Sequence, residues 1–192
     1  MSDHPNDVLR STLLEFLDAG AVIDIYRDRL HPRVPLRCRL LQLSAVAVLV
    51  QKFDDLFRDD GLAVARVSDI TRVHSGVFGT GQPKPLPVAR VRRINEVGLL
   101  ELSAAATILQ REFGVVLVRV EGADPCAFYV GEAVAVDDDF VRLRHLGTLA
   151  LPGRADALVR TDDISLVEAG GQYAVELLGI VSSARRDGPA LA

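Results

Sequence analysis

The sequence is poor in cysteine, methionine and aromatic residues. Its 192 residues include two cysteines, one methionine and no tryptophan, and only 5% are aromatic. Cys38 and Cys126 stand apart in the sequence, which excludes a disulfide framework or a C-x-x-C pair and favours a reducing, cytoplasmic location. The scarcity of aromatic side chains also disfavours a surface that stacks the bases of a single strand.

Long apolar runs are missing as well. The longest, from Leu40 to Val50, contains Gln42 and Ser44 and is shorter than the ~20 residues that a membrane-spanning helix needs. The first seven residues, MSDHPND, are polar and acidic, unlike the basic and then apolar start of a secretory signal. We therefore expect no membrane partner.

The charge balance is slightly acidic. There are 22 lysines and arginines against 26 aspartates and glutamates, for a formal net charge of −4. This balance disfavours a protein that coats nucleic acid or an anionic membrane by bulk charge. With 49% hydrophobic and 25% charged residues, the composition is that of a globular protein, and the length allows one domain or two small ones.

An internal repeat decides between one domain and two. Residues 58–76 match residues 152–170 at an offset of 94, with six identities that include Arg66/Arg160 and Gly76/Gly170. Upstream, residues 21–53 overlie residues 114–146 at an offset of 93. That stretch is matched mainly by an alternation of apolar and polar residues, which is typical of strands. The change of offset indicates one inserted residue.

Each copy predicts one helix and five strands. Apolar residues at helical spacing end at Gly20 in the first copy and at Gly114 in the second, because a glycine accepts the left-handed conformation that ends a helix. The alternating pattern then predicts strands at 21–27, 36–43, 45–53, 61–67 and 69–74, and at 115–120, 127–136, 139–146, 156–161 and 163–168. The fold of residues 171–182, strand or helix, stays open.

These elements predict a mainly β protein with short helices, built as two tandem five-stranded barrels that are each preceded by a helix. Five short strands that bend enough to close remove their own sheet edges. We place the first unit at 1–77, a linker rich in Pro, Gly and Arg at 78–97, the second unit at 98–182 and a flexible tail at 183–192.

The second unit carries a set of family-like features. Gly131 lies in its second strand, Asp137 and Asp138 form the next turn, and the segment LVRTDDISLV spans 158–167. In these features the units resemble the Sm-like fold, an SH3-like barrel shared by Sm, LSm and Hfq proteins. The resemblance covers about 98–170 and, more loosely, 7–76.

The resemblance implies assembly into a ring. Sm-like subunits pair the fourth strand of one with the fifth strand of the next, and segments 61–67 and 156–161 are the candidates for such strand addition. Two units per chain predict a homo-oligomer of three chains, a pseudo-hexameric ring, with RNA as a candidate partner. Val141 or Arg142 replaces the asparagine with which RNA-binding Sm proteins contact RNA, so a protein-binding scaffold is the alternative.

Clustered arginines are the candidate contacts to RNA or to another partner, since guanidinium groups bind phosphates through charge-assisted hydrogen bonds. One cluster surrounds His31, a second follows the linker prolines, and a matched pair lies near the predicted strand edges. These candidates are Arg27, Arg37 and Arg39; Arg90, Arg92 and Arg93; and Arg66 and Arg160. The alternative is a solvated face, or salt bridges to nearby aspartates.

No catalytic residue, metal site or cofactor is predicted. None of the four histidines lies within five residues of another histidine or a cysteine, whereas zinc ligands usually come in short local pairs. Paired aspartates such as Asp162 and Asp163 adjoin predicted turns, where the side chain caps backbone donors. The leading hypothesis is a non-enzymatic Sm-like protein that acts by ring assembly and partner binding. The alternatives are a scaffold without nucleic-acid binding and an enzyme with its site between the barrels.

Overall fold

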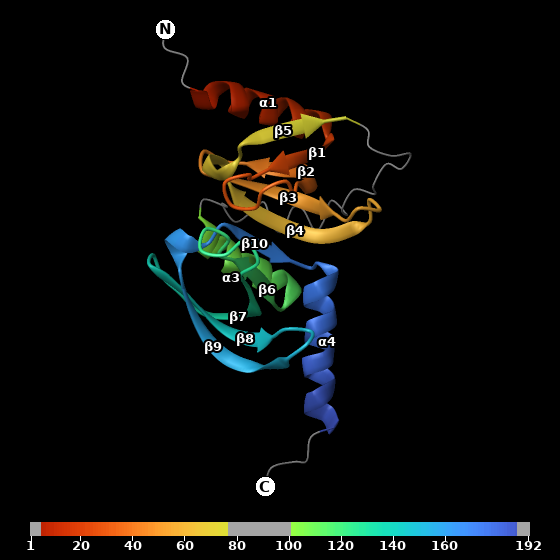
Figure 1. The fold of residues 1–192 in the computed structure, drawn as a ribbon, viewed down its shortest axis with the longest axis vertical. Helices are drawn as coiled ribbons and strands as arrows, with labels where there is room; N and C mark the ends of the chain where they lie inside the picture. The colour runs from red at the N-terminus through yellow and green to blue at the C-terminus, as the bar shows by residue number, and fades with distance from the viewer. Residues whose placement is uncertain (1–4, 77–100, 188–192) are drawn as a thin grey trace.

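The computed structural model describes residues 5–76 and 101–187 (Figure 1). The first half contains α1 (Pro5–Ala19), β1 (Val22–Tyr26), β2 (Leu36–Leu43), β3 (Ala47–Phe53), β4 (Asp59–Arg66), the 3-10 turn η1 (Val67–Asp69) and β5 (Arg72–Ser75). The second half contains α3 (Leu102–Phe113), β6 (Val116–Arg119), β7 (Phe128–Val136), β8 (Phe140–Gly147), β9 (Pro152–Arg160), the 3-10 turn η2 (Thr161–Asp163), β10 (Leu166–Ala169) and α4 (Gln172–Asp187).

The strands form one open antiparallel sheet of ten strands in the order β5-β1-β2-β3-β4-β10-β6-β7-β8-β9. The fold is mainly β, as predicted, but the prediction of two closed Sm-like (SH3-like) barrels is wrong. The edge of β4 is satisfied by β10 from the other half of the chain, so the sheet continues through the whole molecule. Among the strands that the structure describes, β5 and β9 stand at the two ends of the sheet, and we call them its free edges.

The strand pairings repeat between the halves at the offsets found in the sequence. The pair Cys38↔Lys52 of β2 and β3 corresponds to Gly131↔His145 of β7 and β8, at an offset of 93. A bulge follows Leu40 in the first half and Ala133 in the second, again at an offset of 93. The halves therefore share strand order, register and irregularities.

The predicted strands are present, with shifted bounds. The strands predicted at 69–74 and 163–168 begin later, because η1 and η2 occupy the first of these residues, and β9 begins earlier, at Pro152. Residues 171–182, left open in the sequence, belong mostly to α4, which continues to Asp187 within the segment predicted as a tail. The predicted linker, 78–97, lies entirely outside the described residues, within the segment 77–100.

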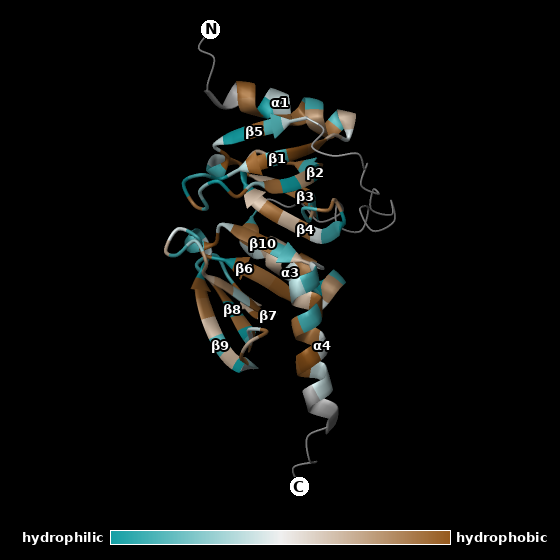
Figure 2. Cartoon of the chain, turned by 45° about the vertical axis from the view of Figure 1, so that its right-hand side comes forward, coloured by the Kyte–Doolittle hydropathy of each residue, from teal (hydrophilic) through white to brown (hydrophobic). Residues whose placement is uncertain are grey.

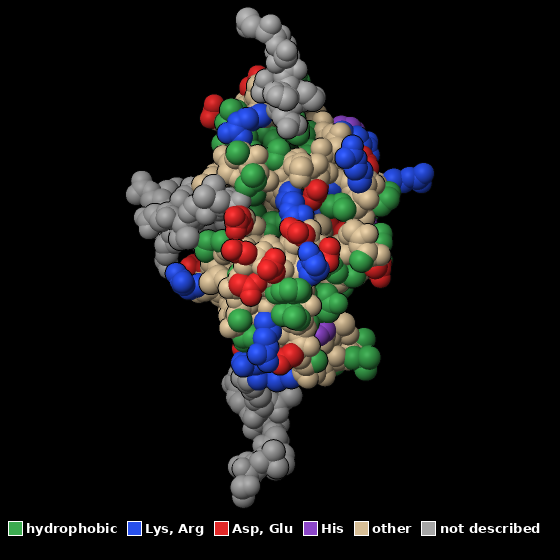
Figure 3. All heavy atoms as spheres, turned by 90° about the vertical axis from the view of Figure 1, so that its left-hand side faces the viewer, with side chains coloured by type: hydrophobic (Ala, Val, Ile, Leu, Met, Phe, Trp, Pro, Cys, Tyr) green, Lys and Arg blue, Asp and Glu red, His purple; other side chains and the backbone are tan. Residues whose placement is uncertain are grey.

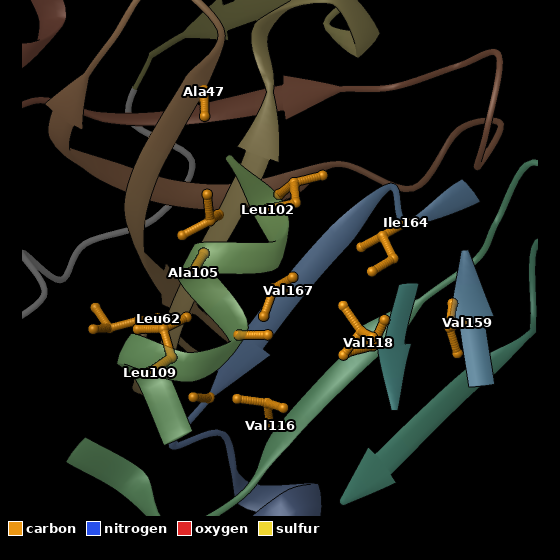
Figure 4. Close-up of a cluster of buried hydrophobic side chains, with 14 of the residues drawn as sticks. Ala47, Leu62, Leu102, Ala105, Leu109, Val116, Val118, Val159, Ile164 and Val167 are labelled. Carbon is orange, nitrogen blue, oxygen red and sulfur yellow. The ribbon is translucent and has the colours of Figure 1, made fainter. Parts of the chain in front are cut away.

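Three apolar clusters stabilise the sheet. One lies under α1 and another under α4, whereas the central cluster combines both halves. There Leu102 and Leu109 of α3 pack with Leu62 of β4 and Val116 of β6 (Figure 4). Figure 2 shows that apolar residues dominate β6, while α4 alternates between apolar and polar residues. Within the described ranges, no helix is long and apolar enough to span a membrane.

Gly61 offers a test of the close contact between β4 and β10. Its φ is +83°, and a Cβ there would overlap the carbonyl oxygen of Ala169 and the backbone that follows it. We expect Gly61→Ala to lower the free energy of unfolding by about 3 kcal/mol or more, because backbone overlap adds to left-handed strain. Urea unfolding measures this loss.

Gly20 is the matched control. Its φ is also positive, at +58°, but a Cβ there would meet nothing within 4 Å. Gly20→Ala should therefore cost only the left-handed strain of about 1–2 kcal/mol. Equal losses in the two variants would show that β4 and β10 do not approach as closely as described.

Candidate functional site

Among the described strands, the pair β4 and β10 joins the sheet of the first half to that of the second. The register is antiparallel, with Ala65 opposite Leu166 and Leu62 opposite Ala169. All four of these residues are buried. This segment, which we call the junction, satisfies the main chain of two strands that would otherwise be sheet edges.

A buried cluster of charges crosses the junction. Glu168 of β10 accepts hydrogen bonds from Lys52 of β3 and Arg119 of β6. Lys52 also lies 3.2 Å from a carboxylate oxygen of Asp60. Burial opposes the ionisation of Glu168, but the charges of Lys52 and Arg119 outweigh it and lower its pKa to about 2. The cluster therefore links β3, β4, β6 and β10 through ionised groups.

Two further polar contacts join the halves. The guanidinium of Arg27 donates to both carboxylate oxygens of Glu121, at 2.5 and 3.0 Å, and Ser165 donates to the same carboxylate. Arg66 at the end of β4 donates to the main-chain carbonyls of Thr161 and Asp162 in η2, each at 2.8 Å. These contacts fix how one half is docked on the other.

A cleft of about 640 Å³ lies beside Arg66, at the end of β4. Its lining includes Arg66, Glu101, Asp138 and Asp162. Figure 3 views the molecule from the side of η2 and shows acidic side chains gathered near the middle of that face. Carboxylates and one guanidinium line the cleft, and none of the described lining residues is a histidine or a cysteine.

The predicted arginine contacts are distributed over several places. Arg27 and Arg66 make two of the contacts between the halves, with Glu121 and with η2. Arg37 and Arg39 lie on β2, where Arg37 donates to Asp24 and Arg39 donates to the carbonyl of Gly20, each at 3.0 Å. Arg160 lies at the end of the free strand β9, 3.8 Å from Asp162. The remaining three, Arg90, Arg92 and Arg93, lie outside the described residues.

The charge cluster itself was missed in the sequence. Lys52 and Glu168 both stand within apolar strands, and a charged residue in such a strand signals a buried partner. They are 116 residues apart, so no short-range sequence pattern indicates that they contact each other.

The free strands β9 and β5 are exposed copies of the junction strands. Leu158 of β9 has 66% of its surface exposed, whereas Val64, its equivalent in β4, is fully buried. Likewise Val73 of β5 is only partly buried, whereas its equivalent Val167 in β10 is fully buried. The same strand positions therefore lie in the interior at the junction and at the surface at the two ends of the sheet.

Comparisons with family models, with curated proteins and with solved structures each found no match. The resemblance to the Sm-like family is thus unsupported by any relative, and the open ten-stranded sheet contradicts it.

Replacing Glu168 tests the charge cluster. Glu168→Gln leaves Lys52 and Arg119 without their shared carboxylate, so we expect a loss of about 3–5 kcal/mol in the free energy of unfolding at pH 7. The pKa of Glu168 is lowered on folding, so its contribution is complete above the ordinary pKa and is lost between about pH 5 and pH 2. Urea unfolding across this range should show the loss in the wild type and not in the variant.

Glu132→Gln is the control of the same chemistry. Glu132 pairs with Arg144 at 3.0 Å on the solvent side of β7 and β8, where an ion pair contributes less than about 1 kcal/mol. A similar loss in the free energy of unfolding in both variants would contradict the larger contribution expected of the buried cluster.

Proposed function

We propose that this protein acts without catalysis, by assembling head to tail through the two free edges of its sheet. In this assembly β9 of one copy pairs with β5 of the next. The observation that carries the proposal is the junction, because β4 and β10 are the repeat equivalents of β9 and β5 and already pair within the chain. Strand addition of this kind is a common route to binding.

The repeat predicts the register of the intermolecular pair. Moving each junction residue by the 94-residue offset converts the observed pairs into antiparallel pairs between copies. These pairs are Val159 with Arg72, Leu158 with Val73, Ala157 with His74, and Asp156 with Ser75. Leu158 and Val73 would then be covered in the way that Val64 and Val167 are covered at the junction, and burying a leucine side chain contributes about 1.5–3 kcal/mol.

Arg160 supports the same arrangement. Its equivalent, Arg66, donates to two main-chain carbonyls of η2 across the junction. In the free chain the side chain of Arg160 is 59% exposed. Across a β9–β5 pair, Arg160 would donate to the carbonyls of Val67 and Ser68 in η1 of the next copy, since these residues are the repeat equivalents of Thr161 and Asp162.

A head-to-tail interface uses two different surfaces, so it closes into a ring or grows into a filament. We propose a closed ring of three chains, because in a closed ring every β9 is paired with a β5. With two repeat halves per chain, such a ring holds six equivalent units. The two thiols, Cys38 buried and Cys126 exposed, are both unpaired, which supports our proposal of a reducing, cytoplasmic compartment.

RNA binding stays a separate prediction. Arg27, Arg37, Arg39 and Arg66 already donate to acceptors within their own chain, and Arg160 lies 3.8 Å from a carboxylate oxygen of Asp162, so we favour a scaffold that does not bind nucleic acid. Phosphate contacts predict a steep loss of affinity as salt rises, which a titration with short U-rich and A-rich RNA measures.

Leu158→Glu tests the assembly. A carboxylate placed at the centre of the β9–β5 pair would be buried against Val73, so we expect the dissociation constant to rise about 100-fold or more. The chain itself should stay folded, because Leu158 is exposed. Light scattering during size-exclusion chromatography gives the mass of each species.

Leu56→Glu is the control, since Leu56 is 72% exposed but lies in the turn between β3 and β4, away from both edges. This variant should keep the mass of the wild type. A wild-type protein that is monomeric at micromolar concentration would refute the proposal.

A cysteine pair tests the register. Residues opposite each other in an antiparallel pair have Cα atoms about 4.5–5.5 Å apart, which suits a disulfide. With Cys126 replaced by serine, Ser75→Cys combined with Asp156→Cys should give covalent oligomers on mild oxidation, seen on non-reducing gels. The control variant carries Arg154→Cys in place of Asp156→Cys. It should form no covalent oligomers, because residue 154 lies two residues out of register with residue 75. Equal cross-linking of both variants would contradict the predicted pairing.

A further inference from the structure

A cavity of about 210 Å³ lies beside the charge cluster, at the start of α4. Lys52, Arg119 and Glu168 form its charged wall, and Leu117 and Phe128 belong to its apolar wall. None of its described lining comes from β5 or β9, so the cavity is independent of the proposed assembly. Its volume corresponds to about seven water molecules, which is too little for a nucleotide or a peptide but enough for a small organic molecule.

Arg119 supplies the cavity with unused hydrogen-bond donors. Its Nε donates to Glu168, whereas its terminal nitrogens have no hydrogen-bond partner among the residues that the structure describes. The guanidinium carbon lies 5.7 Å from the centre of the Phe128 ring, which is part of the cavity wall. Neither terminal nitrogen is among the buried, unpartnered atoms of the described residues, so a molecule in the cavity can reach them.

The charged groups around the cavity cancel before any ligand binds. Its described lining holds two cations, Lys52 and Arg119, and two carboxylates, Asp60 and Glu168. Burial opposes the charged forms of Lys52 and Arg119, but the charge of Glu168 outweighs it and raises both pKa values. Asp60 accepts a hydrogen bond from the main-chain N–H of Gln172 at 3.0 Å, and the first turn of α4 adds about half a positive charge. The local field therefore favours an anion over a cation.

We propose that this cavity binds a small monocarboxylate with an apolar body. The carboxylate accepts two parallel hydrogen bonds from the terminal nitrogens of Arg119, the geometry in which arginine binds carboxylates most specifically. Tyr173 also lines the cavity. Its hydroxyl oxygen accepts from the main chain of Leu149, and its hydrogen has no acceptor among the described residues, so it is a second donor. The apolar body of the ligand packs against Leu117 and Ala174.

A second cavity, of about 230 Å³, shares three lining residues of the charge cluster with the first. Its further arginine, Arg27, already donates through both terminal nitrogens to the carboxylate of Glu121. The second cavity therefore adds no unpaired terminal nitrogen to those of Arg119. We assign the carboxylate to the first cavity, because the guanidinium of Arg119 lies against Phe128 there.

The first experiment titrates the full chain with sodium benzoate at neutral pH and constant ionic strength, followed by isothermal titration calorimetry. Benzoate is the probe because the rings of Phe128 and Tyr173, with centroids 5.4 Å apart, give the cavity an aromatic wall. Benzamide has the same shape without the charge, and inorganic phosphate has the charge without the apolar body. We expect benzoate to bind at least about tenfold more tightly than either. No saturation by benzoate at about 10 mM, or equal affinity for either comparison probe, would overturn the proposal.

Arg119→Lys tests the donor. Lysine keeps a positive charge beside Glu168 but lacks the paired terminal nitrogens, so we expect the dissociation constant of benzoate to rise about tenfold or more. Arg144→Lys is the matched control and should leave benzoate binding unchanged, because Arg144 pairs with Glu132 on the solvent side of β7 and β8. Circular dichroism verifies that both variants are folded. Wild-type affinity in folded Arg119→Lys would show that the guanidinium does not hold the ligand.

Two further variants locate the ligand without changing the charge cluster. Phe128 lines the first cavity and not the second, so Phe128→Leu should raise the dissociation constant of benzoate about threefold or more. Tyr173→Phe removes the hydroxyl donor and should raise it about fivefold. Binding that depends on Arg119 but on neither aromatic residue would place the ligand in the second cavity and overturn the assignment to the first.

Discussion

The pairing of β4 with β10 is the interaction on which the rest of this structure depends. It turns two five-stranded halves into one sheet and gives α3 a surface made of both halves, so that the central apolar cluster belongs to neither half alone. Around this pairing, Glu168 can be buried because Lys52 and Arg119 reach it from two other strands. Main-chain hydrogen bonds, buried apolar side chains and paired charges are therefore all found at or beside the junction.

The two copies of the repeat differ in a way that follows from position. Residues that are buried at the junction, such as Val64 and Glu168, have apolar or firmly paired surroundings. Their equivalents at the free edges, Leu158 and His74, are exposed. The junction forms within one chain, whereas the contact that we propose between copies has to form from separate molecules.

Much of the local structure could be predicted from the sequence. The helix endings at Gly20 and Gly114, the alternation in the strands and the two offsets all depend on short-range rules of backbone conformation and burial, which the residues of each segment carry themselves. The candidate site was predicted only in part. Arg66 and Arg160 were singled out because they match in the repeat, whereas Lys52 and Glu168 were not paired, since they are far apart in the chain.

By itself, the sequence predicted a helix followed by five strands in each half, and the offset that relates the two halves. Only the tertiary structure decided which strand pairs with the outer edge of β4. The same alternating strands could close on themselves or continue into a neighbour, and both arrangements satisfy the local pattern. The choice depends on burial and charge pairing between residues about a hundred positions apart, and this long-range balance turned the expected pair of barrels into one open sheet.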